Sequence, residues 1–228
     1  MSEPNECRCA ASRSASPWIL RWLERLPPGA TVLDFAAGSG RHALAACERG
    51  LRVVAIDRDE QALARLRDAT CMATRATTGA TTGATTGATT GATARPAGRA
   101  DDVAGRGSIA LRVADLEAGP WPFEAHERFD AVVVANYLFR PRFALLAALV
   151  APNGLLIYET FAQGNERHGR PSSPAFLLAP GELLVRARRA GLTVLGYEAG
   201  IVQQPAPAAI QRICAIRARD TEAGATLG

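Results

Sequence analysis

Apolar segments of two kinds alternate along this chain of 228 residues. Short runs rich in valine, isoleucine, leucine and alanine have the length of buried strands, and the segments between them carry apolar side chains at helical spacing. Seven strands are predicted, over residues 31–36, 51–57, 109–114, 131–135, 154–161, 193–197 and 212–217. Five helices are predicted, over residues 17–26, 41–49, 59–70, 142–150 and 181–190. The alternation predicts a doubly wound α/β fold with a mostly parallel sheet.

One segment breaks the alternation, because residues 76–91 repeat ATTG four times without variation. Glycine at every fourth position opposes a helix, and no side chain there is large enough to bury. We therefore expect residues 72–107 to be a disordered insertion in a single domain, 16–219, with disordered tails at 1–15 and 220–228. The insertion joins a helix to the start of a strand, so it should leave the sheet at the edge opposite the one where ligands bind.

The composition suits one globular domain, with 48% hydrophobic residues. No apolar run approaches the roughly 18 residues of a membrane span, and the polar N-terminus lacks the apolar block of a secretory signal. The five cysteines are odd in number and mostly far apart, which argues against a disulfide framework. Cys7 and Cys9 form a lone C-x-C in a polar tail, which would need further ligands to bind zinc, and the chain has only three histidines, so no metal is predicted. We expect a cytoplasmic protein.

The net charge of +4 is a weak indication of nucleic-acid binding. All 26 basic residues are arginine, and they are spread along the chain without a dense run. A small-molecule partner is therefore favoured, and the sequence gives no oligomeric state.

The clearest motif is TVLDFAAGSGR, residues 31–41, in which a buried strand turns sharply into a helix. Small residues at such a turn let a ligand lie against the backbone. Residues 38–43 also fit the G-x-G-x-x-G/A pattern of dinucleotide binders. Asp34 favours a different ligand, because its carboxylate would repel a pyrophosphate and attract the sulfonium and ammonium groups of S-adenosylmethionine.

A second acidic residue, Asp57, ends the next predicted strand. A carboxylate at this point can accept hydrogen bonds from both hydroxyls of a ribose, as it does in both cofactor classes. The alternative is a helix-capping role, which Asp59 could equally fill.

The glycine turn at 31–41, followed along the chain by Asp57, resembles the motifs of class I S-adenosylmethionine-dependent methyltransferases. The resemblance extends over most of residues 17–217. The resemblance implies a Rossmann-like, seven-stranded, mostly parallel sheet with one antiparallel strand. It also implies an adenine contact from Asp115 and a strand, 129–136, that ends beside the transferred methyl group. Ala36 and Asn153 stand where the family usually has glycine. The implied cofactor-binding residues are Asp34, Ala36, Gly38, Gly40, Asp57, Arg58, Asp115, Leu116 and Asn136.

Two further segments are candidates for the substrate side. NYL-x-RP at 136–141 and YETF-x-x-GN-x-x-x-GRP at 158–171 resemble, more weakly, methyltransferases of the tellurite-resistance type. Candidate catalytic residues are Asn136, Tyr137 and His168, with His168 as a base and Tyr137 as a wall of the methyl pocket.

Four residues near the substrate side or the first helix have more than one interpretation: His168, Arg170, Trp18 and Trp22. Arg170 can orient an anionic substrate, or it can pair with Glu159 or Glu166 while His168 is simply solvated. Trp18 and Trp22, four apart on the first helix, are expected to pack on the core, with a place in the substrate pocket as the alternative.

The favoured function is methyl transfer from S-adenosylmethionine to a small molecule. An RNA or protein methyltransferase would need a recognition module or a basic face, and a non-catalytic binding protein of the same fold is a further alternative. A nicotinamide-dependent oxidoreductase of the Tyr-x-x-x-Lys type is excluded, because the sequence contains no lysine.

Overall fold

A seven-stranded sheet forms the centre of the computed structural model, which describes residues 14–78 and 107–218. The strand order is β3-β2-β1-β4-β5-β7-β6. Only β7 runs antiparallel to its neighbours, β5 and β6, within the described chain, so the predicted architecture is confirmed. The strands are β1 (Thr31–Phe35), β2 (Arg52–Asp57), β3 (Ser108–Val113), β4 (Phe129–Ala135), β5 (Val150–Phe161), β6 (Thr193–Val202) and β7 (Ala208–Ile216).

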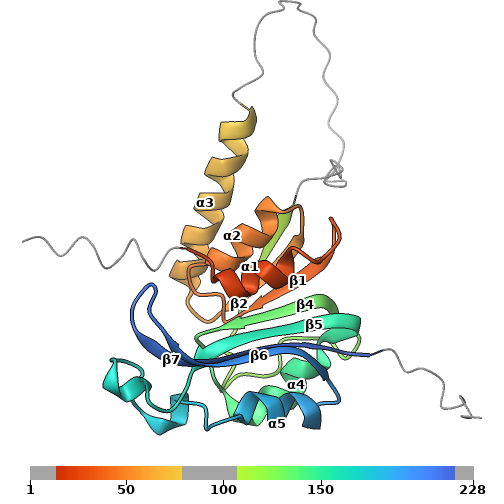
Figure 1. The fold of residues 1–228 in the computed structure, drawn as a ribbon. Coiled ribbons are helices and arrows are strands. Elements are labelled where there is room, and N and C mark those ends of the chain that lie inside the picture. Colours follow the sequence, from red (N-terminus) through yellow and green to blue (C-terminus); the bar gives the residue numbers. More distant parts are fainter. Residues whose placement is uncertain (1–13, 79–106, 219–228) are drawn as a thin grey trace, which may run out of the picture.

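Helices cover both faces of the sheet (Figure 1). On one face lie α1 (Pro17–Leu23), α2 (Arg41–Glu48) and α3 (Glu60–Thr78), and on the other lie α4 (Phe143–Ala148) and α5 (Glu182–Arg189). Side chains of successive residues in β1 and β4 point to opposite faces and enter two separate cores. Both faces are therefore buried, which explains why these strands are continuous apolar runs. No described helix has the length and apolar character needed to cross a membrane.

Several predicted boundaries are wrong. The helix predicted to reach residue 150 ends at Ala148, because Val150 already pairs with Phe129 as the first residue of β5. The first helix ends at Leu23, three residues early. Strands β6 and β7 are longer than predicted and form a hairpin around residues 203–207.

The predicted insertion lies mostly outside the described residues, as do most of the first tail and all of the last. Its predicted start at residue 72 is too early, because α3 continues to Thr78. The chain returns at the amino end of β3, which pairs in parallel with β2. That return lies at the edge opposite the carboxyl ends of the strands, and the predicted disorder stays a prediction.

Candidate cofactor and acceptor cavities

Two neighbouring cavities open at the carboxyl ends of the central strands. The first cavity, of about 240 Å³, is bounded by the ends of β1, β2 and β4 and by the segment after β3. Seven of its eight lining residues are among those the sequence singled out, and only Glu117 was missed. The lining residues are Ala36, Asp57, Arg58, Asp115, Leu116, Glu117, Asn136 and Tyr137.

The turn from β1 into α2 forms one side of the first cavity. Ala36, Gly38 and Gly40 all have positive φ, of 58°, 55° and 73°. A Cβ on Gly38 would meet nothing within 4 Å, so its backbone borders open space, whereas one on Gly40 would overlap the side chain of Leu66. Gly38 thus leaves room for a ligand, and Gly40 is needed for close packing of the turn against α3.

Asp57 is held at the cavity by two backbone amides. The Gly38 N–H donates to Oδ2 at 2.7 Å, and the Asp59 N–H donates to Oδ1 at 2.9 Å. A carboxylate has about four acceptor positions. Both oxygens therefore keep capacity to accept hydroxyl donors from a ligand.

Asp34 lies beneath the turn and does not line the cavity. Its side chain is buried, and its Oδ2 accepts the Ala43 N–H at the start of α2 at 2.9 Å. Burial raises its pKa to about 7, although the Ala43 hydrogen bond and the charge of Arg41 act in the opposite direction. Asp34 thus ties β1 to α2, and the prediction that its charge favours a cationic cofactor stays a prediction.

The segment after β3 is fixed by its own polar groups. Asp115 Oδ1 accepts the N–H groups of Ala118 and Glu117 at 2.9 and 2.8 Å, and these hydrogen bonds lower its pKa. Arg142 donates to the carbonyl oxygens of Leu116 and Gly119 at 3.0 and 2.5 Å. The exposed Asp115 side chain is therefore held at the cavity by a preformed turn.

Tyr137 forms an apolar wall with one polar atom. Its ring packs edge-to-face on Phe35, with the centroids 5.6 Å apart. Its hydroxyl is buried and has no hydrogen-bond partner among the described residues, and burial raises its pKa above the usual value of 10. A buried donor without a partner costs stability unless a ligand or water accepts from it. The group fits a cavity that takes a ligand with polar atoms.

The second cavity, of about 320 Å³, adjoins the first. Its lining comes from the residues before α1, from the start of α2, from the loop after β5 and from the β6–β7 hairpin. Asn136 lines both cavities, and its φ of 55° turns the chain at the end of β4. Its N–H donates to the Glu159 carbonyl oxygen at 2.9 Å. His168 and Arg170 also line the second cavity, so the structure brings these predicted substrate-side residues together with Asn136.

The ion pairs of the second cavity differ from the expected pairing of Arg170 with Glu159 or Glu166. Arg212, which sequence analysis missed, pairs with Glu159 at 3.4 Å and with Glu198 at 2.5 Å. Glu166 instead accepts the Gly164 N–H at 2.8 Å. Arg170 pairs with neither glutamate, so its predicted ion pair is wrong. Arg212 lies 53 residues from Glu159 in sequence, and only strand pairing brings them together.

Two further residues position the segments around the second cavity. The Ser16 N–H donates to Nε2 of buried His42 at 3.2 Å, which ties the start of α1 to α2. Burial, reinforced by the charge of Arg41, lowers the pKa of His42 to about 3, so the ring is neutral at physiological pH. Arg140 in the NYL-x-RP motif bonds Glu182 and the carbonyl oxygens of Ala175 and Leu177, and so fixes the loop before α5.

Trp18 and Trp22 pack in the core, as predicted, and neither lines the second cavity. Their rings pack over Gly196 of β6, and the Arg212 guanidinium lies 5.0 Å from the centroid of Trp18. Within the described ranges, no group of three or more histidine, cysteine or acidic side chains could hold a metal ion.

The sequence matches no family model and no curated protein. Solved structures match the fold. TehB from Haemophilus influenzae aligns with a TM-score of 0.62 and 15% identity over 89% of this chain and 62% of its own, so this chain spans about three fifths of TehB. A methyltransferase from Methanosarcina mazei aligns with a TM-score of 0.57 and 15% identity over 90% and 99% of the two chains.

A third structure was solved with the demethylated cofactor. Magnesium protoporphyrin IX methyltransferase from Synechocystis, with bound S-adenosylhomocysteine, aligns with a TM-score of 0.58 and 14% identity over 88% and 80% of the two chains. The chain therefore has the Rossmann-like fold of class I S-adenosylmethionine-dependent methyltransferases.

Proposed function

We propose that the protein transfers a methyl group from S-adenosylmethionine to a small molecule. The first cavity carries this proposal, because it gathers Ala36, Asp57, Asp115 and Asn136 from separate segments of the fold. These positions match the cofactor motifs in order. The structural neighbours from Methanosarcina mazei and Synechocystis, which are methyltransferases, support the same cofactor.

The residues of the first cavity suit the nucleoside part of this cofactor. Asp57 would accept the ribose hydroxyls with its remaining lone pairs, and Asp115 would face the adenine amino group. The buried Tyr137 hydroxyl would donate to a polar atom of the ligand. When bound, S-adenosylmethionine supplies a methyl group on a positively charged sulfur.

The remaining requirement is to align an acceptor with that methyl group. In-line methyl transfer depends on alignment and exclusion of water, and it needs a base only when the acceptor carries a proton. Asn136 stands at the junction of the two cavities, where it would position both reactants. His168 would take a proton from the acceptor in the second cavity.

The test is isothermal titration with S-adenosylhomocysteine. We expect the wild type to bind it and Asp57→Ala to bind it at least about tenfold more weakly, the range for losing hydrogen bonds to a charged group. Asp68→Ala is the matched control, because Asp68 is exposed on α3 and does not line either cavity. Mass spectrometry of the purified protein identifies any cofactor that it retains.

Two outcomes would count against the proposal. A folded wild type that does not bind S-adenosylhomocysteine would contradict it, as would a nicotinamide dinucleotide retained through purification. Unchanged binding by Asp57→Ala would remove Asp57 from the cofactor site.

A further inference from the structure

The second cavity has walls that a very small polar acceptor would leave uncovered. Phe161 of β5, Ile210 of β7 and Pro205 of the β6–β7 hairpin contribute apolar surface to its lining. A water molecule takes about 30 Å³ of liquid volume. An acceptor of only a few atoms would therefore fill a small part of the 320 Å³ and would bury little of this surface. The cavity suits an acceptor with an apolar body.

The same cavity carries an excess of positive charge. Arg41, Arg170 and Arg212 line it, and Glu159 is its single lining carboxylate among the described residues. Glu159 is already bound by Arg212 and by the Ser16 hydroxyl, which donates at 3.0 Å. The described lining thus contains no second carboxylate to pair with Arg170.

Arg170 is the arginine best placed to meet a ligand. Its side chain is exposed at the cavity and has no ion-pair or hydrogen-bond partner within residues 14–78 and 107–218. The adjacent backbone is anchored, because buried Asn165 donates through Nδ2 to the Pro171 carbonyl oxygen at 2.9 Å. Asn165 also accepts the Ala209 N–H through Oδ1 at 3.2 Å, which ties this loop to β7. The chain therefore holds Arg170 beside the cavity before any ligand binds.

We propose that the second cavity takes an organic anion, with its charged group on Arg170 and its apolar body against Phe161 and Ile210. This inference rests on the proposed function, since it names the class of acceptor for that reaction. A carboxylate and a phosphate ester share the required chemistry, because a guanidinium can bind either through two parallel hydrogen bonds. A neutral amide of the same shape lacks the charge, and a bare oxyanion lacks the body.

The experiment measures binding to protein saturated with S-adenosylhomocysteine. The four probes are phenylacetate, phenyl phosphate, phenylacetamide and selenite, titrated by calorimetry. We expect at least one of the two aromatic anions to bind at least about tenfold more tightly than both the amide and selenite. Comparison of the two aromatic anions identifies the preferred charged group.

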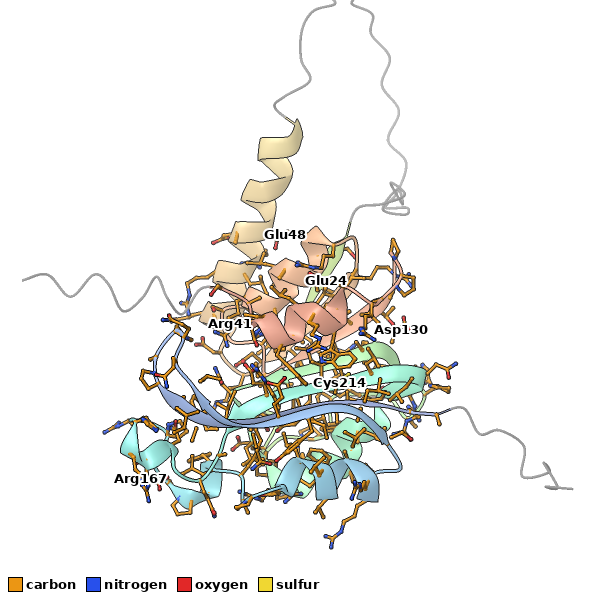
Figure 2. All side chains as sticks on the ribbon, viewed as in Figure 1. Glu24, Arg41, Glu48, Asp130, Arg167 and Cys214 are labelled. Atoms are coloured by element: carbon orange, nitrogen blue, oxygen red, sulfur yellow. The ribbon has the colours of Figure 1, made fainter. Side chains whose placement is uncertain are left out.

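Two variants test whether Arg170 is the residue that binds the charged group of the anion. Arg170→Gln should weaken binding of the aromatic anion at least about tenfold, with S-adenosylhomocysteine affinity unchanged as evidence of folding. Arg167→Gln is the matched control, because Arg167 is exposed in the same loop, lies on its outer part (Figure 2) and does not line the second cavity. It should bind the anion as the wild type does.

Several results would overturn the inference. They are absence of binding by both aromatic anions, equally tight binding of the amide or of selenite, and wild-type affinity in Arg170→Gln. Failure to bind S-adenosylhomocysteine is a separate result, which contradicts the proposed function. Cofactor binding without discrimination among the four probes contradicts the anion inference alone.

Discussion

Ala36 holds a backbone conformation that favours glycine. Its φ of 58° brings its Cβ close to the following carbonyl oxygen, which costs about 1–2 kcal/mol for an L-residue. The position borders the first cavity, where its methyl group also takes up space. This strain follows from the turn between β1 and α2 and persists because the surrounding structure holds it.

Replacing Ala36 by glycine should relieve this strain. We expect Ala36→Gly to raise the free energy of unfolding by about 0.5–1 kcal/mol, after the greater entropy of glycine in the unfolded chain is subtracted. Urea denaturation measures the change. Ala45→Gly in the middle of α2 is the control and should lose about 1 kcal/mol or more. A similar loss in Ala36→Gly would show that the strain is absent.

Asp34 and His42 make opposite contributions to the pH dependence of stability. The Asp34 pKa is about 7 in the folded protein against 3.8 ordinarily, so the folded state binds more protons and stability falls as pH rises through this interval. The His42 pKa is about 3 against 6.5, so the unfolded state binds more protons and stability rises with pH through that interval. The two contributions oppose each other between about pH 4 and 6.5.

In Asp34→Asn, the pH dependence of stability should therefore show the contribution of His42 without the opposing contribution of Asp34. We expect the free energy of unfolding of this variant to rise more steeply between pH 4.5 and 6.5 than that of the wild type, as measured by urea titration. Asparagine can still accept the Ala43 N–H, so the turn is preserved. Asp68→Asn on the exposed side of α3 should keep the wild-type slope. An unchanged slope in Asp34→Asn would mean that Asp34 is ionised throughout this range.

At the scale of the element, β1, β2, β3 and β4 could be predicted closely from the sequence, and β5, β6 and β7 only in part. β1 and β4 are buried on both faces, so their sequences are nearly continuous apolar runs. β7 contains Gln211, which is buried because its amide donates to the Ala179 carbonyl oxygen at 2.7 Å and accepts the Leu183 N–H at 3.4 Å. A buried polar side chain whose partners lie about 30 residues away looks like an exposed residue in the sequence, so the strand was predicted too short.

The packing of α1 on β6 depends on a glycine. A Cβ on Gly196 would lie 2.9 Å from Trp22 Cζ2 and 3.2 Å from Trp18 Cη2. We expect Gly196→Ala to lower the free energy of unfolding by about 1–3 kcal/mol, because the tryptophans must shift within a packed core. Urea denaturation tests this against Gly200→Ala, whose Cβ on the same strand would meet nothing within 4 Å. Equal stability of the two variants would show that the tryptophans adjust freely.

At the scale of the whole molecule, the two cavities differ in how well the sequence predicts them. The first is built from residues at or just after the carboxyl ends of β1, β2, β3 and β4, so knowing the strand order is nearly enough to assemble it. Part of the second depends on pairing across β5, β7 and β6, where Glu159 and Glu198 both stand opposite Arg212. This register cannot be read from spacing along the chain, because antiparallel pairing joins residues at variable separations. The sequence therefore predicted His168 and Arg170 and missed Arg212.

Asn136 is the only lining residue that the two cavities share among the described residues. The hairpin residues Gln204, Pro205, Ala206 and Pro207 contact the second cavity alone. Substitutions in this hairpin can therefore accumulate without altering the residues that line the first cavity. A library randomised at these four positions would therefore vary the wall of the second cavity while the lining of the first cavity stays the same.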